Sequence, residues 1–272
     1  MTTAPLLFDR PALTAHRARA TDGAMFLHHA ARDDVQDRIS MINREFTSVA
    51  IVTPFAEIWA KTFPDATIVG DDDTLALPVN SFDLVIHAMC LHWANDPIGQ
   101  LIQCRRALKQ DGLCLAVLLG GQTLSELRTC LSEAESQVTG GLSPRVAPMA
   151  DIRDLGALLQ RAGLALPVAD SDVLAAEYRD LTHLMHDLRA MGETNALSNR
   201  LRQPTRRGVF DTAAQIYATH FSAESGRISA RYEVISLTGW APSDSQPKPL
   251  RPGSAQRRLA DALGAPETKL SD

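Results

Sequence analysis

The first half of the chain alternates short apolar runs with segments in which apolar side chains recur every three or four residues. Apolar runs of this length predict strands that are buried on both faces; they lie at 48–53, 66–69, 82–89 and 113–119. The periodic segments predict helices; they lie at 19–46, 55–63, 97–109 and 123–138. Strands and helices that alternate in this way predict an α/β fold, with a parallel sheet covered on both faces.

The pattern changes after Gly140-Gly141. Three further helices and two late strands are predicted, the second strand antiparallel; the helices lie at 151–161, 181–191 and 208–221, the strands at 167–174 and 228–240. We therefore expect four regions: an N-terminal arm at 1–20, a core at 21–140, a helical elaboration of the same domain at 141–240, and a mobile tail at 241–272.

Composition narrows the classes of function. The net charge of -5 and the pI near 5.9 argue against a nucleic-acid partner. The sequence contains no run of 18 apolar residues, so no membrane span is predicted. The N-terminal segment lacks the apolar stretch of a signal peptide, so we expect a cytoplasmic protein. The four cysteines form no close-spaced pairs, which predicts reduced, buried thiols and no zinc site.

Several segments, in order, resemble one protein family. The stretch SFDLVIHAMCLHWANDPIGQLIQCRRALKQDGLCLAVLLGG resembles class I methyltransferases, including the malonyl carrier-protein methyltransferase of biotin synthesis. The segments LFDRPAL, GGQTLSELR, GGLSPRVAPMADIRDLGALLQRAGL, LMHDLRAMGETNAL and ISARYEVISLTGW are more similar to the complex I assembly factor 5 family. The resemblance covers most of residues 6–255, except 40–75.

The resemblance implies a seven-stranded, doubly wound, Rossmann-like methyltransferase fold and S-adenosylmethionine as cofactor. For the assembly-factor branch it implies a protein partner, namely a subunit of respiratory complex I, whose maturation includes arginine hydroxylation.

The segment that would form the cofactor loop departs from this family. Such a loop uses glycines for a tight turn and for close approach of backbone to the ligand. Here the first strand leads into Thr53-Pro54-Phe55-Ala56-Glu57, which has no glycine. Pro54 lacks an N–H, and the ring of Phe55 is expected to fill space meant for the methionine end of the cofactor.

The chain between the first strand and Phe82 is also short. Val52 and Phe82 are 30 residues apart, which accommodates one strand–helix–strand unit where the family needs more. We therefore expect one strand–helix unit to be missing.

Candidate cofactor contacts remain in the acidic segment GDDDTLALP and at the next strand end. By resemblance, Asp73 supplies a carboxylate and Thr74 the following amide. In another register Asp71, 20 residues after Ile51, binds the ribose hydroxyls. In a third interpretation Asp71 to Asp73 are solvated loop carboxylates. His87 and Ala88, at the end of the strand 82–89, are further candidates for this site.

Other polar residues have two interpretations each. His92 is either an acid/base residue of an acceptor pocket or a packing residue beside Trp93. Glu126 and Arg128 are expected to be exposed on a helix, where they orient a substrate or form a surface pair. The pair His183 and His186 suggests a metal-binding helix face, although a solvated face is favoured and no metal is expected. The arginines at 200, 202, 206 and 207 dock an acidic partner or lie in a solvated loop.

Two main hypotheses of function follow. The favoured one is a methyltransferase-family protein that has a degenerate cofactor loop and works as an assembly or binding factor. The alternative is an active S-adenosylmethionine-dependent methyltransferase. Hydroxylation is a third, for which no set of two histidines and one carboxylate is recognisable.

Overall fold

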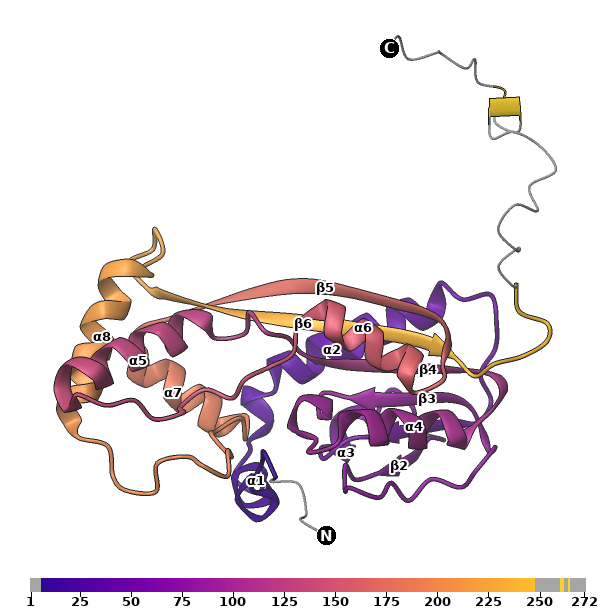
Figure 1. The fold of residues 1–272 in the computed structure, drawn as a ribbon, viewed down its shortest axis with the longest axis horizontal. Helices are drawn as coiled ribbons and strands as arrows, with labels where there is room; N and C mark the ends of the chain where they lie inside the picture. Colours follow the sequence, from indigo (N-terminus) through magenta and orange to yellow (C-terminus); the bar gives the residue numbers. More distant parts are fainter. Residues whose placement is uncertain (1–5, 248–259, 262–263, 265–272) are drawn as a thin grey trace, which may run out of the picture. The chain divides into compact units, whose positions relative to one another are not determined.

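Six strands form one sheet in the computed structural model, which describes residues 6–247, 260–261 and 264 (Figure 1). The sheet order is β2-β1-β3-β4-β6-β5. The strands are β1 Val49–Val52, β2 Thr67–Val69, β3 Phe82–Ala88, β4 Leu108–Leu119, β5 Ala165–Tyr178 and β6 Ile228–Trp240. The neighbours from β2 to β4 pair in parallel, and β6 is antiparallel to both β4 and β5. The expected sheet is confirmed, with six strands in place of seven and a late antiparallel strand.

Helices precede, connect and follow these strands. The α-helices among the described residues are α1 Arg10–Arg17, α2 Phe26–Ser40, α3 Ala56–Ala60, α4 Pro97–Ala107, α5 Ser125–Thr139, α6 Ile152–Arg161, α7 Leu181–Ala190 and α8 Arg207–His220. Two short 3₁₀ helices are η1 Asp22–Ala24 and η2 Leu91–Trp93. None of the helices described is both long and apolar enough to cross a membrane. The predicted tail at 241–272 lies, beyond residue 247, almost wholly outside the described residues.

Alternation of side chains along the strands creates two cores. On β3, Leu84 and Ile86 point to one face of the sheet and share a core with Leu27 of α2 and Trp59 of α3. Val85, between them, belongs to a second core that contains residues of α4 and α6. Both faces of the sheet are therefore covered over β1, β3 and β4, which explains why these strands read as nearly continuous apolar runs.

Helices α5, α7 and α8 gather around one end of the long β5–β6 pair (Figure 1). There the Tyr178 and Tyr232 hydroxyls lie 2.9 Å apart within hydrogen-bond distance. The prediction that Glu126 is exposed on its helix is wrong: its side chain is buried and forms an ion pair with Arg231 of β6. Arg128 is half-buried, and its guanidinium donates to the Ala147 carbonyl at 3.4 Å.

The buried carboxylate of Asp83 fixes the start of β3 against the start of β1. It accepts hydrogen bonds from the Thr47 N–H and hydroxyl at 3.0 Å, and from the Ser48 N–H at 3.0 Å. Burial alone would raise the pKa of Asp83, but these donors outweigh it and hold the pKa below its usual value. The carboxylate therefore contributes stability above the unfolded-state pKa of about 3.9, and this contribution is lost as the pH falls through the native pKa.

We expect Asp83→Ala to lower the free energy of unfolding by roughly 2–3 kcal/mol at pH 7, because buried donors lose a charged acceptor. The difference from the wild type should shrink as the pH falls below about 4. Urea unfolding at several pH values measures both effects. Asp65→Ala, at an exposed turn, is the matched control and should change stability by less than about 0.5 kcal/mol. An equal cost for Asp83→Ala at all pH values would contradict this account.

Candidate functional site

In the loop that follows β1, the backbone N–H groups of residues 53 and 55 are already hydrogen-bonded within the protein. The Thr53 N–H donates to the Val69 carbonyl of β2 at 2.9 Å, and the Phe55 N–H donates to the Thr53 hydroxyl oxygen at 3.2 Å. Pro54 has no N–H. The Phe55 ring packs edge-on against His28 of α2, with centroids 4.8 Å apart. This loop therefore presents no free N–H at 53–55 and fills the adjoining space with an aromatic ring.

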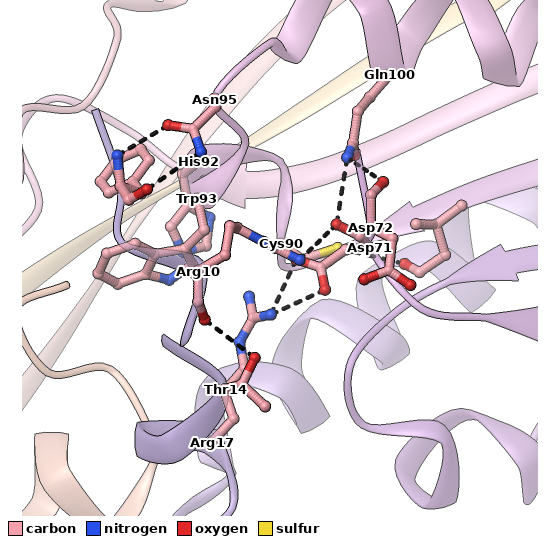
Figure 2. Close-up of polar contacts among 12 residues, drawn as sticks. Arg10, Thr14, Arg17, Asp71, Asp72, Cys90, His92, Trp93, Asn95 and Gln100 are labelled. Atoms are coloured by element: carbon pink, nitrogen blue, oxygen red, sulfur yellow. Dashed lines mark hydrogen bonds and ion pairs between the residues drawn. The ribbon is translucent and has the colours of Figure 1, made fainter. Parts of the chain in front are cut away.

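Two buried ion pairs lie just after the end of the neighbouring strand β2. The Asp71 carboxylate, only 6% exposed as a residue, accepts from the Arg10 guanidinium at 3.1 Å and from the Arg17 guanidinium at 2.9 Å. Figure 2 shows both arginines reaching Asp71 from α1. Arg10 also donates to the Asp71 carbonyl at 2.7 Å. Burial would raise the pKa of Asp71, but the two guanidinium groups outweigh it and hold the pKa below its usual value.

Among the three consecutive aspartates, only Asp71 is buried. Asp73 and Thr74 are exposed, and the Asp73 carbonyl accepts from the Gln103 side chain at 3.0 Å. The two cofactor registers predicted from the sequence thus differ in the structure. One offers a buried carboxylate that is already paired, and the other offers an exposed one.

His87 and Ala88 point to opposite faces of β3. His87 is fully buried, and its Nε2 lies 2.6 Å from the Gln100 amide oxygen. Burial lowers the pKa of His87 to about 4, so the ring is neutral at pH 7. The Gln100 amide nitrogen donates to the carbonyls of Asp71 and Asp72, which connects His87 to the acidic segment. Ala88 instead belongs to the core that contains α2.

His92 lies on η2, directly after β3. The chain turns there through Met89, whose left-handed φ is 53°. The His92 side chain is 2% exposed; its Nδ1 accepts from the Leu119 N–H at 3.4 Å, and its Nε2 lies 3.5 Å from a Glu193 carboxylate oxygen. The same oxygen accepts from the Trp93 indole N–H at 2.8 Å. His92 therefore lies beside Glu193, and both side chains are largely buried.

A cavity of about 570 Å³ lies next to this pair. Its wall includes Trp93 and Glu193, but His92 is not among the lining residues. Glu193, and not His92, thus reaches the cavity. The cofactor candidates Thr53, Asp71, Asp73, His87 and Ala88 are likewise absent from its wall.

Of the remaining predicted residues, Arg200 alone is in the cavity wall. Arg200 and Arg202 both pair with Asp9, at 2.9 and 3.2 Å. Arg206 occupies the N-cap position of α8 without a capping hydrogen bond from its side chain, and Arg207 is exposed. His183 and His186 are exposed on α7. In the part of the chain that the structure describes, no group of three His, Cys, Asp or Glu side chains is placed to hold a metal ion.

Sequence reasoning missed Arg10, Arg17, Gln100 and Glu193. For the first two a signal was present. The motif Asp9-Arg10-Pro11 is a helix start, and the Asp9 side chain accepts from the Ala12 N–H at 3.1 Å. Two arginines seven residues apart lie on the same face of such a helix. Nothing in the sequence near Gln100 or Glu193 marks them as functional.

Comparison with known proteins identifies related chains. A model of the methyltransferase domain matches residues 29–116. "Arginine-hydroxylase NDUFAF5, mitochondrial" of Rattus norvegicus is 37% identical over 225 residues, which is 81% of this chain and 65% of the relative. The human protein of the same name is 37% identical over 192 residues, which is 71% of this chain and 55% of the relative.

A malonyl-[acyl-carrier protein] O-methyltransferase of Xylella fastidiosa is 36% identical over 180 residues, covering 66% of this chain and 59% of the relative. The aligned region is thus about two thirds or less of each of these relatives. Among solved structures, the YcgJ protein of Bacillus subtilis superposes with a TM-score of 0.49 at 16% identity, covering 79% of this chain and all of that one. The region matched here belongs to the methyltransferase-domain family, and the chain is similar within it to the NDUFAF5 branch.

Proposed function

We propose that this chain is a methyltransferase-family protein that does not use S-adenosylmethionine and works as a binding or assembly factor. The proposed partner is a protein, by resemblance to the assembly-factor branch a subunit of respiratory complex I.

The observation that carries the proposal is the state of the loop after β1. A methyltransferase of this fold needs backbone donors and space at this turn. The Thr53 N–H is bonded to Val69, Pro54 has no N–H, and the Phe55 N–H is bonded to Thr53. A ligand seated here would have to break these bonds and displace the Phe55 ring from His28.

The second recognition feature, a free carboxylate near the strand ends, is also engaged. Asp71 holds two guanidinium groups, so a ribose hydroxyl could bind it only if α1 moved away. Separation of a buried ion pair leaves uncompensated charges and typically costs about 3–5 kcal/mol. The residues present therefore do not fit the cofactor, and we derive no methyl-transfer step for this chain.

An active methyltransferase is the second candidate, because the matched family model spans the loop and the cavity beside Glu193 resembles an acceptor site in size. For that function α1 would act as a lid that releases Asp71. We do not propose the hydroxylation named for relatives, since residues 6–247, 260–261 and 264 offer no metal-binding set of side chains.

Calorimetric titration with S-adenosylmethionine and with S-adenosylhomocysteine separates the two candidates. We expect no binding heat at ligand concentrations up to the millimolar range, and a normal isotherm for a malonyl-[acyl-carrier protein] O-methyltransferase measured in parallel. A dissociation constant in the micromolar range for this chain would overturn the proposal and favour the active enzyme.

The assembly role is tested in cells that carry this gene. Deletion should lower the amount of assembled respiratory complex I, and the wild-type gene should restore it. Unchanged complex I after deletion would contradict the proposed partner while leaving the cofactor proposal standing.

We expect Arg17→Met to lower the free energy of unfolding by about 2–3 kcal/mol, below the usual cost of breaking a buried pair because Arg10 stays bound to Asp71. The native pKa of Asp71 is depressed, so the wild-type contribution is present above about pH 4 and lost as the pH falls. Urea unfolding at pH 7 and pH 3 should therefore show a smaller cost in acid. Arg179→Met, which removes an exposed pair with Asp180, is the control and should cost less than about 1 kcal/mol. Equal stability of Arg17→Met and wild type would show that the Arg17–Asp71 pair does not help to hold α1 on the sheet.

A further inference from the structure

The cavity beside Glu193 has an apolar body. Its wall includes apolar side chains of β4, α2, α5, α7 and α8, among them Leu27, Leu119, Leu127, Leu131, Leu188 and Phe210. Its volume of about 570 Å³ is within the range of small-molecule sites, about 300–1,000 Å³. Transfer of an alkyl chain from water into such a cavity is favourable, because it removes apolar surface from water.

Four arginines also line the cavity, and they differ in their partners. Arg145 is paired with Glu135, and Arg200 is paired with Asp9. Arg19 and Arg189 are exposed and form no ion pair within the described part of the chain. Their guanidinium groups thus remain free to bind an anion at the edge of an apolar cavity.

Arg19 and Arg189 line the same cavity as His16. Burial lowers the pKa of His16, and the positive charges of Arg19, Arg200 and Arg189 lower it further. His16 is therefore neutral at pH 7, and its Nδ1 lies 3.2 Å from the Thr194 carbonyl. The guanidinium groups of Arg19 and Arg189 thus add positive charge to the cavity wall, while His16 adds none.

The carboxylate of Glu193 is the acidic group of the wall, but its charge is offset. One oxygen accepts from the Trp93 indole. Burial would raise the pKa of Glu193, but the nearby His92 and Arg17 outweigh it and hold the pKa below its usual value. The cavity therefore combines an apolar wall, a Glu193 carboxylate that already has partners, and two guanidinium groups, of Arg19 and Arg189, that form no ion pair in the described part of the chain.

We propose that this cavity binds an acyl-chain anion, with its alkyl chain among the leucines and its carboxylate or phosphate between Arg19 and Arg189. Guanidinium groups form charge-assisted, bidentate hydrogen bonds with both headgroups. The inference rests on the proposed binding function, for which it names a ligand class. It does not depend on the loop at 53–55.

The test is calorimetric titration with dodecanoate, dodecyl phosphate, dodecanol and acetate, below the concentration at which each forms micelles. We expect one-to-one micromolar binding of at least one of the two anions, and no binding of acetate. Dodecanol should bind at least about tenfold more weakly than the preferred anion. The stronger of the two anions identifies the headgroup.

Variants locate the site. Arg19→Gln combined with Arg189→Gln should weaken binding of the anion by about tenfold or more, whereas Arg161→Gln, at an exposed position of α6 outside the cavity, should leave it unchanged. Met185→Trp fills the cavity from a half-buried position of α7 and should abolish binding without lowering the melting temperature by more than a few degrees. A brominated dodecanoate should quench part of the tryptophan fluorescence of the wild type, and this quenching should be lost in Trp93→Phe, which keeps Trp59 and Trp240.

Failure of both anions to bind the folded wild type would overturn the inference. So would equal binding of dodecanol, or binding that survives Met185→Trp. The S-adenosylmethionine titration has a separate readout: cofactor binding without anion binding refutes both proposals, and anion binding with cofactor binding refutes only the proposed function.

Discussion

The ion pairs between Asp71 and the two arginines of α1 join the N-terminal segment to the carboxyl end of the sheet. A carboxylate removed from water needs such partners. Asp71 obtains them from Arg17 and Arg10, which precede it in the sequence by 54 and 61 positions. Gln100 extends the connection, because its amide bridges the Asp71 carbonyl and His87. Figure 2 shows that Asn95, which bonds the backbone of Phe8, anchors the same N-terminal segment a few residues earlier.

The Asp71 ion pairs and the loop after β1 lie at the same edge of the sheet, where the neighbouring parallel strands β1 and β2 end. The loop lacks free donors at 53–55, and α1 occupies the carboxylate that would face a nucleoside. The cavity beside Glu193 is separate, since none of these residues lines it. The proposed lack of cofactor binding and the proposed anion site therefore concern different places in the fold.

The sequence predicted β1, β3 and β4 well, because each is largely an apolar run that is buried on both faces of the sheet. It predicted only the middle of β5, 167–174, because most of this strand is exposed or half-buried and carries polar residues. It did not predict α1, although Asp9 and Pro11 mark its start. It assigned Glu126 to the surface, since helical spacing does not reveal that Arg231 of a distant strand offers a partner. Asp71 likewise looks solvated beside two other aspartates. Long-range pairing of charges decides these cases, and a single sequence contains no local signal for it.

A crystal structure determined after growth with millimolar S-adenosylmethionine tests the central claim most directly. The account predicts Arg10 and Arg17 on Asp71, the Phe55 ring on His28, and no nucleoside at the ends of β1 and β2. A cofactor seated against residues 53–55, with α1 displaced and Asp71 bound to the ribose, would contradict it.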